Sequence, residues 1–321
     1  MSKPKILVLS TGGTILQKEV SGRMEVVVPV EAIAREIAVE AEVDFREVTR
    51  VSGAEMNFAV LLQLRDVIAA ARADGVAGVV LTTGTDSLEE MAFALDLMLP
   101  PLGPVVITGA MKPTSALGYD GAANLADALQ VALSEEARSI GVTVVMSGVV
   151  HAAQHLRKQD SALFSAFQSH PGSIADIRRG RPCYYYTMLP QPQRYLLVDE
   201  VRLTRLKVIV WTMVVQAFLP EQILDGVDGL VVAGMGTGSL SQEIISKLSS
   251  TWTSRVPVVL TTRCLTGGNY DDHLYKGSLQ KYESHGFRLA GYEGLNALQA
   301  RIKLMLEIAS GSVAATTALT T

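Results

Sequence analysis

The sequence is poor in cysteine and in charge, and it contains no long hydrophobic run near its start. Its two cysteines, Cys183 and Cys264, form no C-x-x-C motif and provide no disulfide framework. The net charge of −4 provides no basic field for nucleic acid or an anionic membrane surface. The apolar run in MSKPKILVLS is too short for a signal peptide or a membrane span. We therefore expect a cytoplasmic protein with no nucleic-acid and no membrane partner.

The hydrophobic content, 48% of 321 residues, is sufficient for two domains of typical size. In the first half of the chain, short apolar runs typical of buried strands alternate with helical patterns. The expected strands cover residues 5–9, 78–81, 104–107 and 141–146, and the expected helices cover residues 57–73, 88–98 and 121–136. This order predicts an α/β fold with a parallel sheet and helices on both of its faces.

A segment rich in Pro, Gln and Tyr, CYYYTMLPQPQRYLL at residues 183–197, interrupts this alternation. A shorter series follows, with expected strands at residues 208–211, 230–233 and 257–260. The sequence therefore predicts a larger N-terminal α/β domain at residues 1–182, a linker at 183–207 and a smaller C-terminal α/β domain at 208–321.

Two threonines, Thr11 and Thr14, flank a pair of glycines where the first expected strand ends, in LSTGGTILQKE. Glycines allow the backbone to turn sharply and to approach a ligand closely. The nucleotide-binding motifs do not fit, because there is neither G-x-G-x-x-G nor a Lys-Ser/Thr pair after the glycines. Two interpretations stay open: a tight turn whose threonines bond to their own backbone, or a nucleophilic threonine that needs partners elsewhere in the chain.

The second strand ends in LTTGTDSLEEM, which puts Thr85 and Asp86 just before an expected helix. Ser87 and Glu90 form the S-x-x-E pattern of a capping box. Free N–H groups at a helix N-terminus favour a negative oxygen nearby, although Asp86 taken alone is more typical of a second capping residue. Ligands bind at the C-terminal ends of parallel strands, so these turns and a third one, ITGAMKPTSALGYDGAANL, predict one pocket.

Four motifs in unbroken order, TGGTI, GTDSLEE, ITGAMKP with DGAANL, and VVMSGVV running on to Lys158, resemble the L-asparaginase/glutaminase family of Thr-dependent amidohydrolases. The resemblance covers nearly the whole chain. It implies that Thr14 is the nucleophile, that Thr85 and Asp86 are the family's Thr-Asp pair, and that Lys158 is the catalytic lysine. It also implies that the Asp86 carboxylate holds the substrate's α-ammonium group and that Ala110 faces the substrate.

Amide hydrolysis requires residues of these types. A threonine hydroxyl is a weak nucleophile until a base takes its proton, and burial lowers the pKa of a lysine towards neutrality. We therefore expect Lys158 to act as the base through Thr85, and backbone N–H groups of the glycine-rich turns to stabilise the oxyanion. The expected catalytic residues are Thr14, Thr85, Asp86 and Lys158, and the expected substrate-binding residues are Gly13, Ser52, Gly53, Gly84, Asp86 and Ala110.

Two segments depart from the family pattern. Residues 15–28 lack the tyrosine that the family usually carries in the mobile loop after the nucleophile. The stretch VSGAEMN presents Gly53 and Ala54 where the family has a serine for the substrate α-carboxylate and then Gln or a small polar residue. Ser52 or backbone N–H groups could substitute, and we expect weaker binding of free L-asparagine. The acidic residue that the neighbouring subunit adds in the family is not assigned, although Asp271 and Asp272 lie near that region.

Other patterns have simpler interpretations. HAAQH at residues 151–155 has zincin spacing, but Ala152 stands where the general-base Glu is required, which favours structural or surface histidines. AGMGTGSL at residues 233–240 lacks the third fingerprint glycine and predicts a turn, and the tyrosines at residues 184–186 are expected to pack within the linker. We therefore expect no metal and no cofactor.

The default reaction is hydrolysis of L-asparagine to L-aspartate and ammonia through a threonyl acyl-enzyme. Two alternatives stay open: hydrolysis of another small amide or lactam in an altered pocket, and a catalytically silent member that binds a small molecule. The resemblance implies a homodimer or homotetramer with sites at the intimate interface.

Overall fold

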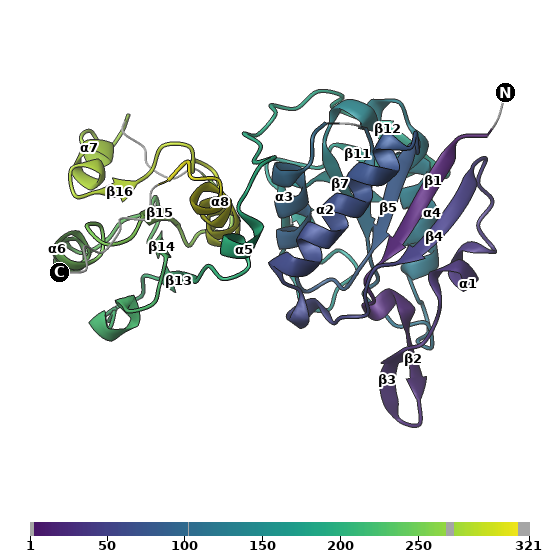
Figure 1. Ribbon diagram of the computed structural model, residues 1–321, viewed down its shortest axis with the longest axis horizontal. Helices are drawn as coiled ribbons and strands as arrows, with labels where there is room; N and C mark the ends of the chain where they lie inside the picture. Colours follow the sequence, from purple (N-terminus) through teal and green to yellow (C-terminus); the bar gives the residue numbers. More distant parts are fainter. Residues whose placement is uncertain (1–2, 102, 268–272, 314–321) are drawn as a thin grey trace. The chain divides into compact units, whose positions relative to one another are not determined.

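The computed structural model describes residues 3–101, 103–267 and 273–313, and it divides the chain into two compact units, Met1–Leu196 and Leu197–Thr321 (Figure 1). The division falls inside residues 183–207, the segment expected to be a linker. The start of that segment belongs to the last strand of the first unit, and its end carries the short helix α5 (Glu200–Leu203) of the second unit. Both units are α/β, as predicted.

The first unit is built on one eight-stranded sheet, with the strand order β12-β11-β8-β7-β6-β5-β1-β4. Five neighbouring strands, β7 to β4 in that order, are parallel, and the other three are added in antiparallel orientation. The antiparallel strands and the edge strand β4 are not among the predicted ones. The strands are β1 (Lys5–Ser10), β4 (Glu42–Glu47), β5 (Gly78–Thr82), β6 (Val105–Thr108), β7 (Val142–Met146), β8 (Val149–Ala152), β11 (Ala175–Arg178) and β12 (Arg181–Tyr184).

Helices cover both faces of this sheet, as the apolar strand sequences require. On one face, alternate strand residues such as Ile6, Val8, Val80 and Val106 form a buried cluster with α1 and α4. Figure 1 shows α2 and α3 in front of the sheet, on its other face. The helices are α1 (Val30–Ala34), α2 (Phe58–Ala73), α3 (Leu88–Met98) and α4 (Gly121–Leu133), with short 3-10 turns η1 (Thr14–Leu16), η2 (Gly53–Glu55) and η3 (Glu136–Ser139).

The N-terminal caps of α2 and α3 differ. The side chain of Asn57 accepts hydrogen bonds from the N–H groups of Ala59 and Val60, which starts α2. Ser87 is the N-cap residue of α3, but its side chain makes no capping hydrogen bond, so the predicted capping box with Glu90 is wrong. Instead, the carboxylate of Glu89, in the first turn of α3, accepts a hydrogen bond from the backbone N–H of Lys158.

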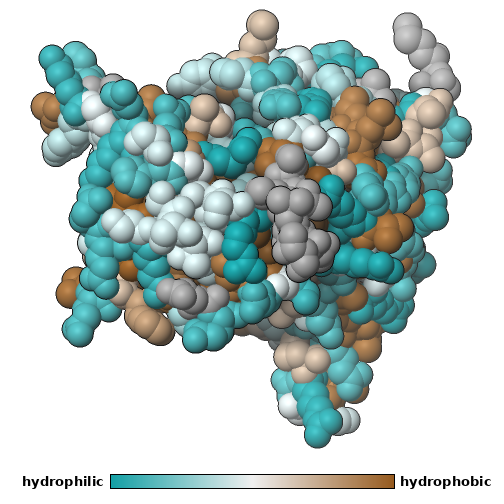
Figure 2. Space-filling model, turned by 60° about the vertical axis from the view of Figure 1, so that its left-hand side comes forward, coloured by the Kyte–Doolittle hydropathy of each residue, from teal (hydrophilic) through white to brown (hydrophobic). Residues whose placement is uncertain are grey.

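Two small hairpins lie outside the main sheet. The first, β2 (Gln17–Val20) and β3 (Arg23–Val26), directly follows η1 and projects from the unit, with a hydrophilic tip (Figures 1 and 2). The second pairs β9 (Leu156–Lys158) with β10 (Phe167–Ser169). The polar sequence of the first hairpin and the shortness of the second explain why neither is predicted.

The second unit has a four-stranded parallel sheet in the order β13-β14-β15-β16. Two of its strands contain the runs predicted at residues 208–211 and 230–233, and a third begins at Val258, one residue after the start of the run predicted at 257–260. The elements are β13 (Val208–Thr212), η4 (Glu221–Leu224), β14 (Gly229–Gly234), α6 (Gln242–Thr251), β15 (Val258–Thr262), α7 (Ser278–Glu283), β16 (Phe287–Arg288) and α8 (Ala297–Ala309).

Candidate active site

The two threonines around the first glycine pair occupy different environments. Thr11 is fully buried, and its hydroxyl donates a hydrogen bond to Oγ1 of Thr83 at 2.8 Å. Thr14 is half-buried and begins the turn η1 directly after the strand-end glycines. The Thr11 hydroxyl is thus bonded to a side chain at the second strand end, and not to the backbone of its own turn. Thr11 therefore joins the first strand end to the second, and Thr14 is the threonine with an accessible surface.

The glycines let three chain segments meet backbone to backbone. Gly13 has φ of 85°, and a Cβ on it would overlap the backbone of Gly84. A Cβ on Gly84 would lie 3.1 Å from the backbone nitrogen of Gly53. Glycine is required where a side chain would have to occupy another backbone. The predicted substrate-binding residues Gly13, Gly53 and Gly84 are thus brought together.

Lys158 reaches the second strand end from β9. Its Nζ lies 3.1 Å from Thr85 Oγ1 and 2.7 Å from Asp86 Oδ1. The Lys158 side chain is 14% exposed, whereas that of Asp86 is 73% exposed. The ring of Phe167, the β-sheet partner of Lys158, lies 6.0 Å from the ammonium group. Three of the four predicted catalytic side chains therefore form one cluster at the edge where β5 ends.

Glu89 is an acidic residue of this cluster that sequence reasoning missed. It lies in the first turn of α3, and its carboxylate accepts a hydrogen bond from the backbone N–H of Lys158 at 3.3 Å. Burial raises the pKa of the Glu89 carboxyl, while the hydrogen bond and the nearby Arg157 and Lys158 act in the opposite direction. In the sequence, only its position three residues after Asp86 indicates that Glu89 lies near the site.

The stretch VSGAEMN lies against the same cluster. A Cβ on Gly53 would approach Cβ of Asp86 to 2.9 Å, so the glycine allows this close contact. The N–H of Ser52 donates to the Glu55 carboxylate at 2.9 Å, and hydrogen bonds from Ser52 lower the pKa of Glu55. Ser52 and Ala54 are exposed. The segment therefore contributes backbone, rather than a long side chain, to the surroundings of Asp86.

The third strand end is held rigid by the DGAANL motif. The Asp120 carboxylate accepts hydrogen bonds from the N–H groups of Met111 and Lys112 at 3.0 to 3.1 Å. Asn124 donates to Asp120 and to the carbonyl of Gly109. Ala110 is fully buried within this loop. The aspartate and asparagine of the motif thus fix the loop that carries Ala110.

The first histidine of HAAQH lies in the main sheet of the first unit. His151 is buried on β8, its Nδ1 lies 2.8 Å from Ser169 Oγ, and burial lowers its pKa to about 4. Among the residues that the structure describes, no group of three or more His, Cys, Asp or Glu side chains is arranged to hold a metal ion.

The predicted turn after β14 is confirmed, because a single bridge joins Met235 and Ser239 before α6 begins. A Cβ on Gly234 would lie 2.5 Å from the backbone of Gly238, which explains the glycine spacing. Asp271 and Asp272 lie outside the described residues.

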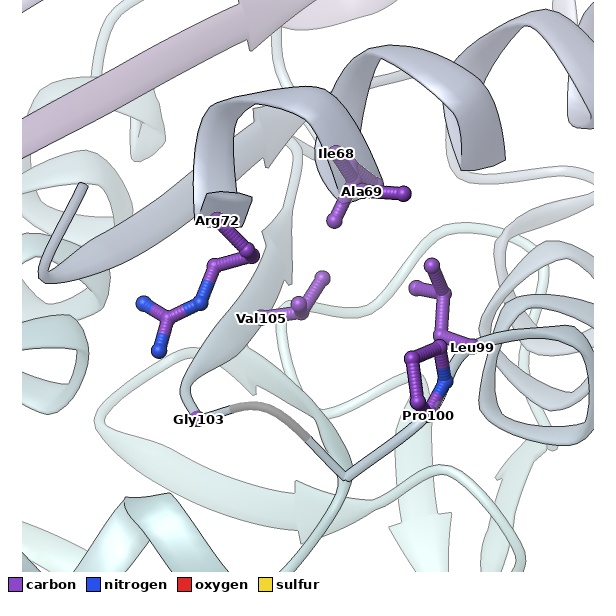
Figure 3. A pocket seen from close by; sticks show the side chains of 7 residues that line it. All are labelled: Ile68, Ala69, Arg72, Leu99, Pro100, Gly103 and Val105. Carbon is purple, nitrogen blue, oxygen red and sulfur yellow. The ribbon is translucent and has the colours of Figure 1, made fainter. Parts of the chain in front are cut away.

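One cavity lies away from the strand ends that carry the candidate site. Figure 3 shows Arg72 of α2, Leu99 at the end of α3 and Val105 among the residues that line it. Val105 is the first residue of β6, so the cavity is at the N-terminal edge of the strand. It has room for about one water molecule. The cavity is too small for an amide substrate.

No helix in the described part of the chain is both long and apolar enough to cross a membrane.

The chain matches family models along most of its length. The model described as "Asparaginase, N-terminal" matches residues 5–189, and that of the "Glutaminase/Asparaginase C-terminal domain" matches residues 210–318. A protein named "Probable L-asparaginase" from Deinococcus radiodurans is 35% identical over 75% of this chain and 73% of its own length. "L-asparaginase 2" from Escherichia coli is 30% identical over 96% of this chain and 90% of its own length.

A solved structure has the same fold along nearly the whole chain. It is the probable cytoplasmic L-asparaginase from Campylobacter jejuni, which superimposes with a TM-score of 0.83 at 27% identity and covers 95% of both chains. The two-domain α/β fold predicted from the sequence is thereby confirmed.

Proposed function

The chain belongs to the asparaginase family, and we propose that it hydrolyses the side-chain amide of L-asparagine to L-aspartate and ammonia, with Thr14 as the nucleophile. As a member of this family it is an amidohydrolase that acts on a linear carboxamide. The observation that carries the proposal is the position of Lys158 Nζ, within hydrogen-bond distance of both Thr85 and Asp86.

In the first half of the reaction, Thr14 Oγ1 attacks the carboxamide carbon while its proton passes to the Thr85–Lys158 pair. The carbonyl oxygen becomes an oxyanion, which backbone N–H groups of the glycine-rich turns stabilise. The C–N bond then breaks, and the nitrogen takes up the proton and leaves as ammonia. Two contacts support this sequence: the backbone approach of Gly13 to Gly84, and the 3.1 Å separation of Lys158 Nζ from Thr85 Oγ1.

In the second half, a water molecule attacks the Thr14 ester and gives its proton to the same Thr85–Lys158 pair. The ester C–O bond breaks, which releases L-aspartate and restores the threonine hydroxyl. Splitting one difficult step into two easier ones is the general advantage of a covalent intermediate.

Substrate recognition falls to Asp86 and the surrounding backbone. Asp86 is largely exposed and uses Oδ1 for Lys158, so its carboxylate is accessible to the α-ammonium group of the substrate. Gly53 provides no side chain for the α-carboxylate, and the Ser52 N–H is already bound to Glu55. Recognition of that carboxylate therefore depends on the remaining backbone N–H groups and on the loop of Ala110, which predicts a higher KM than side-chain donors would give.

We further propose that the enzyme works without a metal or cofactor, in the cytoplasm, as a homodimer or homotetramer. The chemistry of the site supports the first point, because a threonine, a lysine and backbone donors supply nucleophile, base and oxyanion contacts. The name of the Campylobacter jejuni neighbour supports the location. Activity is expected to survive dialysis against a chelator, and size-exclusion chromatography with light scattering is expected to give the mass of two or four chains.

A panel of amides tests the proposed function. L-asparagine, L-glutamine, the D-enantiomer of asparagine, succinamic acid and a small lactam are incubated with the purified protein, and ammonia release or ring opening is followed. L-asparagine is expected to have the highest kcat/KM. Preferential opening of the lactam or hydrolysis of succinamic acid would show that this compound, and not asparagine, is the preferred substrate. No turnover of any amide would favour a catalytically silent binding protein.

A further inference from the structure

The segment that follows Thr14 leads directly into a projecting hairpin. Residues 14–16 form η1, and β2 begins at the next residue (Figure 1). The hairpin is exposed along most of its length. Motion of the hairpin would be transmitted to the nucleophile unless the base of the hairpin is held.

The segment is held by hydrogen bonds to its backbone carbonyls. Buried or constrained carbonyls require donors, and each donor here is identified. Three carbonyls are bound by backbone N–H groups: Gly13 O by Leu16, Thr14 O by Gln17, and Leu16 O by Val27 and Val28. The first two of these bonds close the turn η1, and the third joins it to the chain that returns from the hairpin.

The two remaining carbonyls are bound by side chains and backbone from the loop after β6. The hydroxyl of Tyr119 donates to Ile15 O at 2.8 Å. Thr114 donates to Gln17 O twice, from its N–H at 2.9 Å and from its hydroxyl at 2.7 Å. We name these three hydrogen bonds the Tyr119 latch. No carbonyl from residue 13 to residue 17 is left without a donor.

Tyr119 is itself fixed in place. It packs beside the buried cluster that includes Ile15, and a Cβ on Gly121 would overlap its ring and hydroxyl. Burial raises the pKa of the Tyr119 hydroxyl, with a smaller contribution from Asp120, so the hydroxyl stays protonated as a donor. The loop that carries it is tied down by Asp120 and Asn124. The latch is therefore attached to a rigid support.

We propose that Tyr119 is a positioning residue for catalysis, which acts through the Ile15 carbonyl to hold the turn of Thr14 against the loop of Ala110. This inference rests on the proposed function. Residues 15–28 contain no tyrosine, and the tyrosine that reaches this segment comes from residue 119, 104 positions after Ile15. A small displacement of the nucleophile lowers the rate of its attack, so loss of the Tyr119 latch is expected to lower kcat.

The test compares four single variants of the full-length protein. Tyr119→Phe removes only the hydroxyl, and Gly121→Ala displaces the ring while leaving the hydroxyl present. Tyr184→Phe is the matched control, because the Tyr184 hydroxyl is also half-buried and bonded at 2.7 Å, to Ser134. Gly172→Ala is the control for adding a methyl group, since nothing lies within 4 Å of its built Cβ.

Two measurements are made on each variant. The first is the kcat and KM for the amide turned over fastest by the unmodified enzyme; the second is hydrogen exchange at the amides of Leu16 and Gln17, which close η1. Tyr119→Phe and Gly121→Ala are expected to lower kcat about threefold to tenfold or more, with little change in KM, and to raise exchange at both amides by a similar factor. Both controls are expected to match the unmodified protein.

The outcomes separate the latch from the proposed function. Unchanged exchange at Leu16 and Gln17 in Tyr119→Phe would overturn the latch even if the unmodified protein hydrolysed no amide. Raised exchange with unchanged kcat would overturn the positioning role and leave only a structural bond. Equal losses of kcat in Tyr119→Phe and Tyr184→Phe would likewise contradict it.

Discussion

Lys158 Nζ lies 2.7 Å from Asp86 Oδ1, although the two residues are 72 positions apart and belong to a small hairpin and a helix N-terminus. The lysine side chain is nearly buried and the aspartate is mostly open. The pair therefore has an inner end, at which Lys158 also contacts Thr85, and an outer end that is accessible to a substrate. This arrangement places the contact with Thr85 at the buried end of the pair and leaves the Asp86 carboxylate open for recognition.

The first prediction concerns the inner end. Lys158→Met is expected to lower kcat by about 10² to 10⁴, because it removes the group that accepts the proton through Thr85. Steady-state ammonia release measures this effect, with Lys281→Met on α7 as a control for the loss of one positive charge. A kcat within tenfold of the unmodified enzyme would rule out Lys158 as the base.

The second prediction concerns Gly53. Its sequence position suggests that Gly53→Ser would restore a donor for the substrate α-carboxylate and lower KM. The structure leads to the opposite expectation, because any Cβ there lies 2.9 Å from the Asp86 Cβ and must displace it. Gly53→Ser and Gly53→Ala are both expected to raise KM for L-asparagine more than they lower kcat.

Ala54→Ser is the matched control for the Gly53 variants, since Ala54 is exposed and adjacent. Its kinetics are expected to match those of the unmodified enzyme. A lower KM in Gly53→Ser would show that the segment moves to accept the side chain and that its close contact with Asp86 is not required.

The strand ends that carry the candidate site could be predicted from the sequence for a physical reason. Strands β1, β5 and β6 are largely buried, and their continuous apolar runs end in turns that combine threonine and glycine, which are visible in the sequence. The antiparallel strands β8, β11 and β12 have four residues each, and the apolar residues of β11 and β12 are interrupted by charged ones, so they have no comparable pattern. Contacts such as that of Tyr119 with Ile15 join distant positions and leave no periodic signal.

The third prediction concerns the buried bridge between Thr11 and Thr83. Thr11→Val and Thr83→Val are each expected to lower the free energy of unfolding by about 1–3 kcal/mol. Each change removes the 2.8 Å hydrogen bond between the two hydroxyls and leaves the remaining hydroxyl with only a longer one, to the Thr82 carbonyl or to the Met91 sulfur. The double variant is expected to lose less than the sum of the two, which denaturant titrations will measure.

Thr143→Val is the control for this cycle. Thr143 is buried, and its hydroxyl has no hydrogen-bond partner among the residues described by the structure. Its replacement is expected to be neutral or stabilising. Additive losses at Thr11 and Thr83 would mean that the two hydroxyls are not energetically coupled.

The fourth prediction concerns the pH dependence of stability. Burial lowers the pKa of His151 from 6.5 to about 4, so between these values the unfolded chain binds more protons than the folded one. This residue therefore contributes stability that is lost as the pH falls from about 6.5 to 4, by up to roughly 3 kcal/mol. The melting temperature of His151→Gln is expected to fall less steeply over this range than that of the unmodified protein. Parallel curves would contradict the buried neutral state of His151.

The nucleophile is the centre of the account, and the variant Thr14→Ala tests it most directly. Ammonia release from L-asparagine is measured for this variant beside the unmodified enzyme and Thr11→Val, with melting temperatures to confirm folding. We expect Thr14→Ala to lose kcat by a factor on the order of 10⁴ or more while remaining folded, and Thr11→Val to retain most of its activity. A folded Thr14→Ala variant with kcat within tenfold of the unmodified enzyme would contradict the assignment of Thr14 as the nucleophile.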